Sequence, residues 1–179
     1  MYEYEPIIKK INPDIVENCV DYLKTHNMAN RGRFDGDPVK QKTGLVGELE
    51  CYFLLKWNYP NLNEKEDGFD GGIDIVHEGY SYDVKTMGRK SDTIGKWWYA
   101  NNFVASQLPY KCDRVIFASI NWKTKMIEFC GWLHKKEIPF VGKLHKKGEI
   151  RRNNIKDIPL EADSYEIMNR DLRDIRELL

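Results

Sequence analysis

The sequence predicts an α+β fold in which a central mixed sheet of about four strands is flanked by helices. Two pairs of short runs rich in β-branched and aromatic residues, at 73–86 and 115–131, have the character of strands joined by turns. Apolar residues recur at helical spacing from Val39 to Trp57, before the first pair. A helix is also expected at Trp97–Leu108, between the two pairs. The expected order is helix, strand, strand, helix, strand, strand.

Length and composition favour one folded domain spanning residues 1–179. Hydrophobic residues make up 41% of the chain and aromatic residues 12%, which is typical of a globule and not of a disordered chain. No apolar run approaches the roughly 20 residues of a membrane span, and the first residues do not have the pattern of a signal peptide. We therefore expect an intracellular, cytoplasmic protein. Its four cysteines are scattered without metal-binding spacing, which argues against a disulfide framework and a structural zinc site.

Two flanking helices are expected outside this core. Asn12-Pro13-Asp14 combines an N-cap, a proline at the first helical position and an acid in the first turn, and it predicts a helix at about 13–25. Apolar residues at helical spacing predict a second helix from Asp163 to Leu179. Between the core and this last helix, the basic segment from His134 to Arg152 is expected to form a loop or a loose hairpin.

The first strand pair is predicted to be a β-hairpin that places two carboxylates side by side. Glu78-Gly79 suits a tight turn, and a two-residue loop there pairs His77 with Tyr80. Counting outward, Asp74 falls opposite Asp83, and the Cβ atoms of such a pair lie roughly 5 Å apart. A three-residue loop would instead pair Asp74 with Val84, one residue further on.

Facing carboxylates repel each other, and a divalent cation with oxygen ligands relieves that repulsion. The period of two along a strand puts Lys85 on the face of Asp83, whereas Val84 points the other way. One face of the hairpin then presents Asp74, Asp83 and Lys85 together. An ordinary surface hairpin with alternating polar residues is the alternative interpretation.

These residues resemble the signature of the PD-(D/E)XK nuclease superfamily, in its restriction-endonuclease-like and junction-resolvase-like branches. Gly72-Ile73-Asp74 and Tyr82-Asp83-Val84-Lys85-Thr86 carry the resemblance, and the proline of the signature is absent. The resemblance covers about residues 43–132 and implies a restriction-endonuclease-like core. It also implies a Mg²⁺ site, with Mn²⁺ as a substitute. The implied ligands are Asp74, Asp83, the backbone carbonyl of Val84, and Glu48 from the preceding helix, for which Glu50 is the rival position.

The implied activity is metal-dependent hydrolysis of phosphodiester bonds, with DNA as the expected substrate. Lys85 would orient the attacking water or neutralise the charge that develops on the phosphate. Three alternatives stay open: a nuclease-fold binding module without catalysis, a nuclease specific for junctions, flaps or RNA, and a structural subunit with a chance motif. Metal-dependent cleavage of a plasmid would separate a nuclease from the binding module and the subunit.

The charge distribution suggests where a nucleic acid would bind. Nine acidic residues and two lysines lie between Glu48 and Asp83, whereas seven Lys or Arg and two Glu lie between His134 and Arg152. The basic run either follows a phosphate backbone or is a solvated face. Small nucleases of this type often act as dimers, so a homodimer is one expectation. The candidate nucleic-acid-binding residues are Arg89, Lys90, Lys96, Lys143, Lys146, Lys147, Arg151 and Arg152. Trp97, Trp98 and Tyr99 could stack on bases, although core packing is the alternative for at least one of them.

Overall fold

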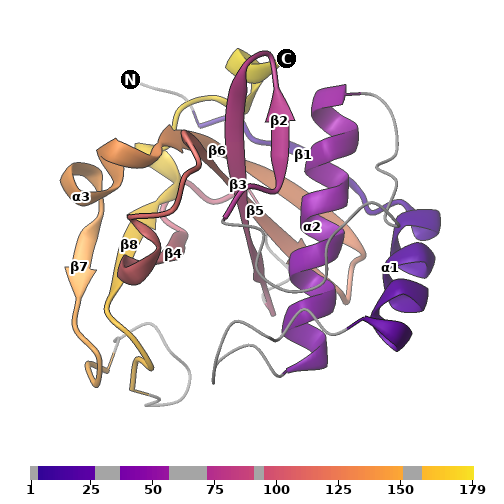
Figure 1. Cartoon of the computed structure of the whole chain (residues 1–179), viewed down its shortest axis with the longest axis horizontal. Helices are drawn as coiled ribbons and strands as arrows, with labels where there is room; N and C mark the ends of the chain where they lie inside the picture. The colour runs from indigo at the N-terminus through magenta and orange to yellow at the C-terminus, as the bar shows by residue number, and fades with distance from the viewer. Residues whose placement is uncertain (1–3, 27–36, 57–71, 91–94, 151–158) are drawn as a thin grey trace.

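The structure, a computed structural model, describes residues 4–26, 37–56, 72–90, 95–150 and 159–179. Within these ranges the protein is built from three layers: two helices, a larger sheet and a smaller sheet (Figure 1). Helices α1 (Pro13–Thr25) and α2 (Pro38–Lys56) cover one face of the larger sheet, and the smaller sheet lies on its other side. The α+β class predicted from the sequence is confirmed.

The larger sheet contains five of the described strands in the order β1-β6-β5-β3-β2. β3 and β5 run parallel and the other neighbours run antiparallel, so the sheet is mixed, as predicted. The sequence predicted about four strands, and β1 at the N-terminal end is the additional one. The strands are β1 (Ile7–Lys10), β2 (Ile75–His77), β3 (Tyr80–Gly88), β5 (Arg114–Asn121) and β6 (Met126–His134).

The smaller sheet is antiparallel, with the order β4-β8-β7 among the residues described. It consists of β4 (Ala100–Val104), β7 (Lys143–His145) and β8 (Ser164–Met168). Short helices connect and follow these strands. They are α3 (Ile138–Val141) and the 3-10 helices η2 (Ala105–Gln107), η3 (Lys135–Glu137), η4 (Asn169–Asp171) and η5 (Ile175–Leu178).

Both long helices follow the sequence signals closely. In α1 the side chain of Asn12 accepts a hydrogen bond from the Asp14 amide at 2.9 Å, with Pro13 at the first position, as predicted. α2 begins one residue before the predicted start, and Trp57 lies outside the described residues. A Cβ atom at Gly47 would overlap the side chain of Thr86, so α2 lies directly against β3 at this point. None of the described helices is long and apolar enough to span a membrane.

Two apolar clusters, one on each face of the larger sheet, form the core. The first joins α1 and α2 to the sheet and includes Tyr82 and Val84 of β3. The second joins the larger sheet to the smaller one and includes Val115 and Phe117 of β5. Successive residues of a strand point to opposite faces, so Asp83 and Lys85, whose β5 partners are Val115 and Phe117, point away from the helices.

The predicted helix at Trp97–Leu108 is wrong. Trp97 and Trp98 form a turn, residues 100–104 form β4, and only the 3-10 helix η2 follows. Asn101 and Phe103 are fully buried whereas their neighbours are not, which is the period of two of a strand. The predicted order of helix, strand, strand, helix, strand, strand is therefore wrong as well, because a strand stands where the second helix was expected.

The predicted C-terminal helix is also wrong. Residues 164–168 form β8, and two short 3-10 helices follow it. The basic segment, predicted as a loop or loose hairpin, contains η3, α3 and β7 among its described residues. The C-terminal segment forms a strand because β8 pairs with β4. Pairing between segments so far apart in sequence leaves no local pattern from which it could be predicted.

Candidate active site on the β2–β3 hairpin

The hairpin has the predicted two-residue turn. His77 pairs with Tyr80, and the turn residues Glu78 and Gly79 have φ angles of 49° and 80°. Two successive left-handed residues are the mark of the tight turns that match strand twist, and glycine favours the second position. The three-residue loop is excluded, and the register continues through Val76 with Ser81 to Ile75 with Tyr82.

Asp74 lies immediately before β2, at the edge of the larger sheet. Its amide donates to the carbonyl of Tyr82 at 2.8 Å, and its Oδ2 accepts a hydrogen bond from the amide of Val84 at 2.7 Å. The strand pairing of β2 with β3 ends at Ile75 with Tyr82, and beyond it the side chain of Asp74, in place of a backbone carbonyl, accepts from the Val84 amide of β3. The predicted pairing of Asp74 with Asp83 stays a prediction.

Asp83 and Lys85 form an ion pair on the face of β3 that points away from α2. Lys85 Nζ lies 2.7 Å from Asp83 Oδ1, and the two side chains are 18% and 3% exposed, respectively. The second oxygen of Asp83, Oδ2, is buried and accepts no hydrogen bond from the part of the chain that the structure describes. A buried carboxylate oxygen without a donor is an unfavourable arrangement that a cation would relieve.

The negative charges of these carboxylates contribute to raised pKa values of two buried thiols, Cys112 and Cys51. Burial raises the pKa of the Cys112 thiol to about 11, and the negative charges of Asp83 and Asp74 add to this rise, partly opposed by Lys85. On the helix side, burial raises the pKa of Cys51, and the charges of Glu50, Asp74 and Glu48 add to it.

Glu48 and Glu50, the two rivals for a third ligand, are both buried on α2 at 6% and 0% exposure. Glu50 has a structural role: Oε1 accepts from the Asn12 amide at 2.6 Å, and Oε2 lies 2.7 Å from Lys9 Nζ. Oε2 has no hydrogen bond in the structure, so we treat its contact with Lys9 as an ion pair of poor hydrogen-bond geometry. These contacts tie Glu50 to β1 and to the start of α1. Glu48 also lies on α2, which covers the face of the sheet opposite to Asp83 and Lys85.

Comparisons with protein-family models, curated proteins and solved structures find no match to this chain. Within the described ranges, no three His, Cys, Asp or Glu side chains gather closely enough to hold a metal ion. The role of Glu48 as a third ligand stays a prediction. Asp74 and Asp83 fit a hard cation on two grounds: both offer only carboxylate oxygens, and Oδ2 of Asp83 is a buried acceptor with no donor.

The candidate nucleic-acid-binding residues are spread over three places. Lys90 and Lys96 follow β3, and Lys143 is exposed on β7. Lys146 and Lys147 both bind Asp163, the first through Nζ at 3.0 Å and the second through its amide at 2.8 Å. Arg151 and Arg152 lie outside the described residues.

Arg89 is engaged inside the protein. Its guanidinium donates to Ser119 Oγ at 3.1 Å and to the carbonyl of Ala100 at 2.8 Å, and it lies 5.2 Å from the ring centre of Tyr99. Ser119 belongs to the larger sheet and Ala100 to the smaller one, so Arg89 ties the two sheets together. A phosphate would have to compete with these contacts.

Sequence reasoning missed a cation–aromatic stack near the tip of the hairpin. The guanidinium of Arg114 lies 3.4 Å from the ring centre of Tyr80 and 4.7 Å from that of Trp132, and it donates to the Tyr82 hydroxyl at 3.0 Å. These residues come from three different strands, so no local pattern in the sequence could have brought them together.

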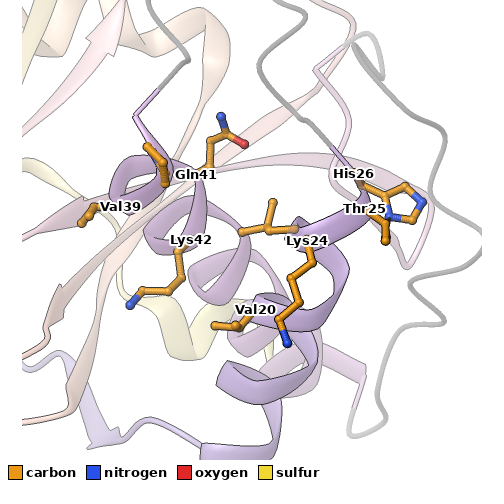
Figure 2. Close-up of a pocket in the computed structure, with 9 residues that line it drawn as sticks. Val20, Lys24, Thr25, His26, Val39, Gln41 and Lys42 are labelled. Carbon is orange, nitrogen blue, oxygen red and sulfur yellow. Dashed lines mark hydrogen bonds between the residues drawn. The ribbon is translucent and has the colours of Figure 1, made fainter.

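A groove of about 570 Å³ between the end of α1 and the start of α2 is separate from this site (Figure 2). Val20 and Val39 face it from the two helices, with Lys24 and Lys42 at its rim. Its described lining residues include no carboxylate.

Proposed function

We propose that this protein is a divalent-metal-dependent nuclease that hydrolyses phosphodiester bonds, with DNA as the expected substrate. The observation that carries the proposal is the buried pair of Asp83 and Lys85 on β3, next to Val84, whose amide binds the carboxylate of Asp74. Within it, Asp83 Oδ2 is buried without a hydrogen-bond donor. A protein that only needed a stable hairpin would gain nothing from that oxygen.

Asp74 and Asp83 would hold Mg²⁺ or Mn²⁺, with Glu48 and the carbonyl of Val84 as further proposed ligands. When bound, such an ion lowers the pKa of water and stabilises negative charge on a phosphate and its leaving oxygen. The hydrogen bond from the Val84 amide at 2.7 Å fixes the orientation of the Asp74 carboxylate. This bond preorganises one ligand before any ion arrives.

Lys85 would act on the phosphate. In the structure its ammonium rests on Asp83 Oδ1, and part of the side chain reaches solvent. An ammonium at this position can move from the carboxylate to an entering phosphate and neutralise the charge that grows there as water attacks. It thereby favours the transition state over the bound substrate.

Cleavage of a supercoiled plasmid and of labelled oligonucleotides with Mg²⁺ or Mn²⁺ tests the proposal. Asp74→Asn and Asp83→Asn should each lower the cleavage rate about 100-fold or more, because loss of a direct metal ligand should cost more than the 10- to 100-fold loss caused by removing an outer partner of a ligand. Lys85→Met should also lower the rate about 100-fold or more, because it removes the cation that would neutralise the phosphate charge in the transition state. Asp21→Asn is the matched control, since Asp21 is an exposed carboxylate of α1 that pairs with Lys24. Its rate should stay near that of the wild type.

Absence of metal-dependent cleavage across single-stranded, duplex, flap, junction and RNA substrates would overturn the assignment as a nuclease. Wild-type rates in both Asp74→Asn and Asp83→Asn would overturn the site instead.

A further inference from the structure

We propose that the turn carrying Trp97 and Trp98 is a stacking platform for unpaired bases, so that the protein binds nucleic acid with single-stranded character. The inference rests on the proposed function in taking nucleic acid as the ligand, and it adds the substrate class. Trp97 and Trp98 are adjacent in sequence, and their large apolar side chains are 45% and 50% exposed, respectively. Single exposed apolar residues are common, but two adjacent indoles on one turn are a surface suited to binding.

The turn is held rigidly by buried polar groups. Glu128, 1% exposed, accepts a hydrogen bond from the Gly95 amide at 3.2 Å. Asn169, fully buried, donates from Nδ2 to the Lys96 carbonyl at 3.0 Å and from its amide to the Tyr99 carbonyl at 2.8 Å. The Arg170 amide donates to the Trp97 carbonyl at 2.9 Å.

The same polar groups are anchored in turn. Asn101 donates to Asn169 Oδ1 at 2.8 Å, and the hydroxyl of Tyr4 donates to Glu128 Oε1 at 2.6 Å. Fully satisfied buried networks of this kind rigidify what they hold. A rigid support for exposed aromatic rings lowers the entropy lost on binding, which is the advantage of a preorganised surface.

The orientation of the rings favours unstacked bases. The two indole centres are 5.4 Å apart and their planes meet at 88°. Successive bases in a regular helix are parallel, so rings at right angles cannot both stack on neighbours within one. They can stack only on bases that have left the regular stack, as in a single strand or at a distorted position.

Charge complementarity favours nucleic acid over an apolar protein partner. Lys96 Nζ lies 5.3 Å from the ring centre of Trp98, and the guanidinium of Arg170 lies 5.1 Å from that of Trp97. Each exposed ring thus has a cation beside it, and Lys90 is exposed a few residues earlier. An alternation of rings and cations matches the alternation of bases and phosphates.

The platform lies at a useful distance from the candidate active site. Arg89, whose guanidinium contacts the Tyr99 ring, is six residues beyond Asp83 along the direction of β3. At roughly 3.3 Å per residue, this separation is about 20 Å. It corresponds to roughly six nucleotides at the 3.4 Å spacing of one strand in a duplex.

Binding measured without hydrolysis tests the inference. In EDTA, the fluorescence anisotropy of a labelled oligothymidylate of about 20 nucleotides should report tighter binding than that of a blunt duplex of equal length. Replacing both tryptophans, W97A/W98A, should weaken binding to the single strand by about fivefold or more per ring removed. The change should be much smaller for the duplex. Trp97→Phe with Trp98→Phe should restore most of the affinity, because phenylalanine also stacks.

Phe140→Ala is the matched control, since Phe140 is 89% exposed on α3 and its loss should leave binding unchanged. Equal affinity of the wild type and W97A/W98A for the single strand would overturn the inference. It would also be overturned if sedimentation showed that W97A/W98A abolishes self-association while DNA affinity stays the same, since the rings would then form a dimer contact. Tryptophan-dependent binding without any cleavage would leave the platform in place and remove only the proposed catalytic activity.

Discussion

Asp83 is nearly fully buried, and its two carboxylate oxygens have unequal surroundings. Oδ1 faces the ammonium of Lys85 at 2.7 Å, whereas Oδ2 has no donor among the described residues. The desolvation of a buried ion costs several kcal/mol, and one ion pair with a partly exposed lysine offsets only part of it. Buried groups left in this state cluster at functional sites, where a ligand completes them. The buried Oδ2 atom of Asp83 distinguishes the hairpin from a solvated polar surface.

Substitution of Glu48 and of Glu50 should distinguish a metal ligand from a structural carboxylate on α2. Glu48→Gln should lower metal-dependent cleavage and weaken the response to Mg²⁺, because a carboxylate that acts as a ligand loses its charge. Glu50→Gln, two residues away, should leave the dependence on metal unchanged and should lower the melting temperature, because it breaks the contact with Lys9. The measurement is the cleavage rate against metal concentration, with melting curves for both variants.

If both substitutions shift the metal dependence equally, a general loss of charge explains the effect, and Glu48 is not a ligand. If Glu48→Gln cleaves as well as the wild type, the site contains only the two hairpin carboxylates.

At the scale of elements, the hairpin could be predicted and the smaller sheet could not. The turn at Glu78-Gly79, the parity of Asp83 and Lys85, and the proline start of α1 are local signals, and each is confirmed. The two segments that were wrongly predicted as helices contain β4 and β8, and these strands pair with each other. Phe103 of β4 and Ile167 of β8 are both in the second apolar cluster. β4 and β8 are stabilised as strands by pairing with each other. The spacing of apolar residues within one segment does not reveal a partner about sixty residues away in sequence.

Two glycines of α2 differ in how closely they approach β3, and substitution of each by alanine tests this packing. Gly47→Ala would place a methyl group on the side chain of Thr86, whereas Gly44→Ala meets nothing within 4 Å. Overpacking costs about 1–3 kcal/mol, and the gain in helix propensity is at most about 1 kcal/mol. Gly47→Ala should therefore lower the melting temperature, and Gly44→Ala should raise it by about 2–4 °C.

Differential scanning calorimetry measures both shifts. The same direction of change in the two variants would show that helix propensity governs α2, and it would contradict a close contact with Thr86. Because Lys85 precedes Thr86 and Glu48 follows Gly47, Gly47→Ala should also reduce cleavage, whereas Gly44→Ala should not.

At the scale of the whole molecule, metal binding and folding stability should be linked through Asp83. Any cation that binds the folded protein and not the unfolded chain stabilises the fold by about 2.7 kcal/mol at 100 times its dissociation constant. For a chain of this length, that gain raises the melting temperature by roughly 5–10 °C. Mg²⁺, Mn²⁺ and non-catalytic Ca²⁺ should all produce the rise.

Asp83→Asn should remove most of this response, because it removes one proposed ligand. Its melting temperature without metal should change little, since loss of the pair with Lys85 opposes the relief of repulsion from Asp74. Asp163→Asn, which breaks an exposed pair with Lys146, should keep the full response. Na⁺ at equal ionic strength separates screening from binding, because screening would raise the melting temperature of all three proteins alike. A full metal response in Asp83→Asn would mean that the cation binds elsewhere, and the face of β3 that carries Asp83 and Lys85 would then not be the metal site.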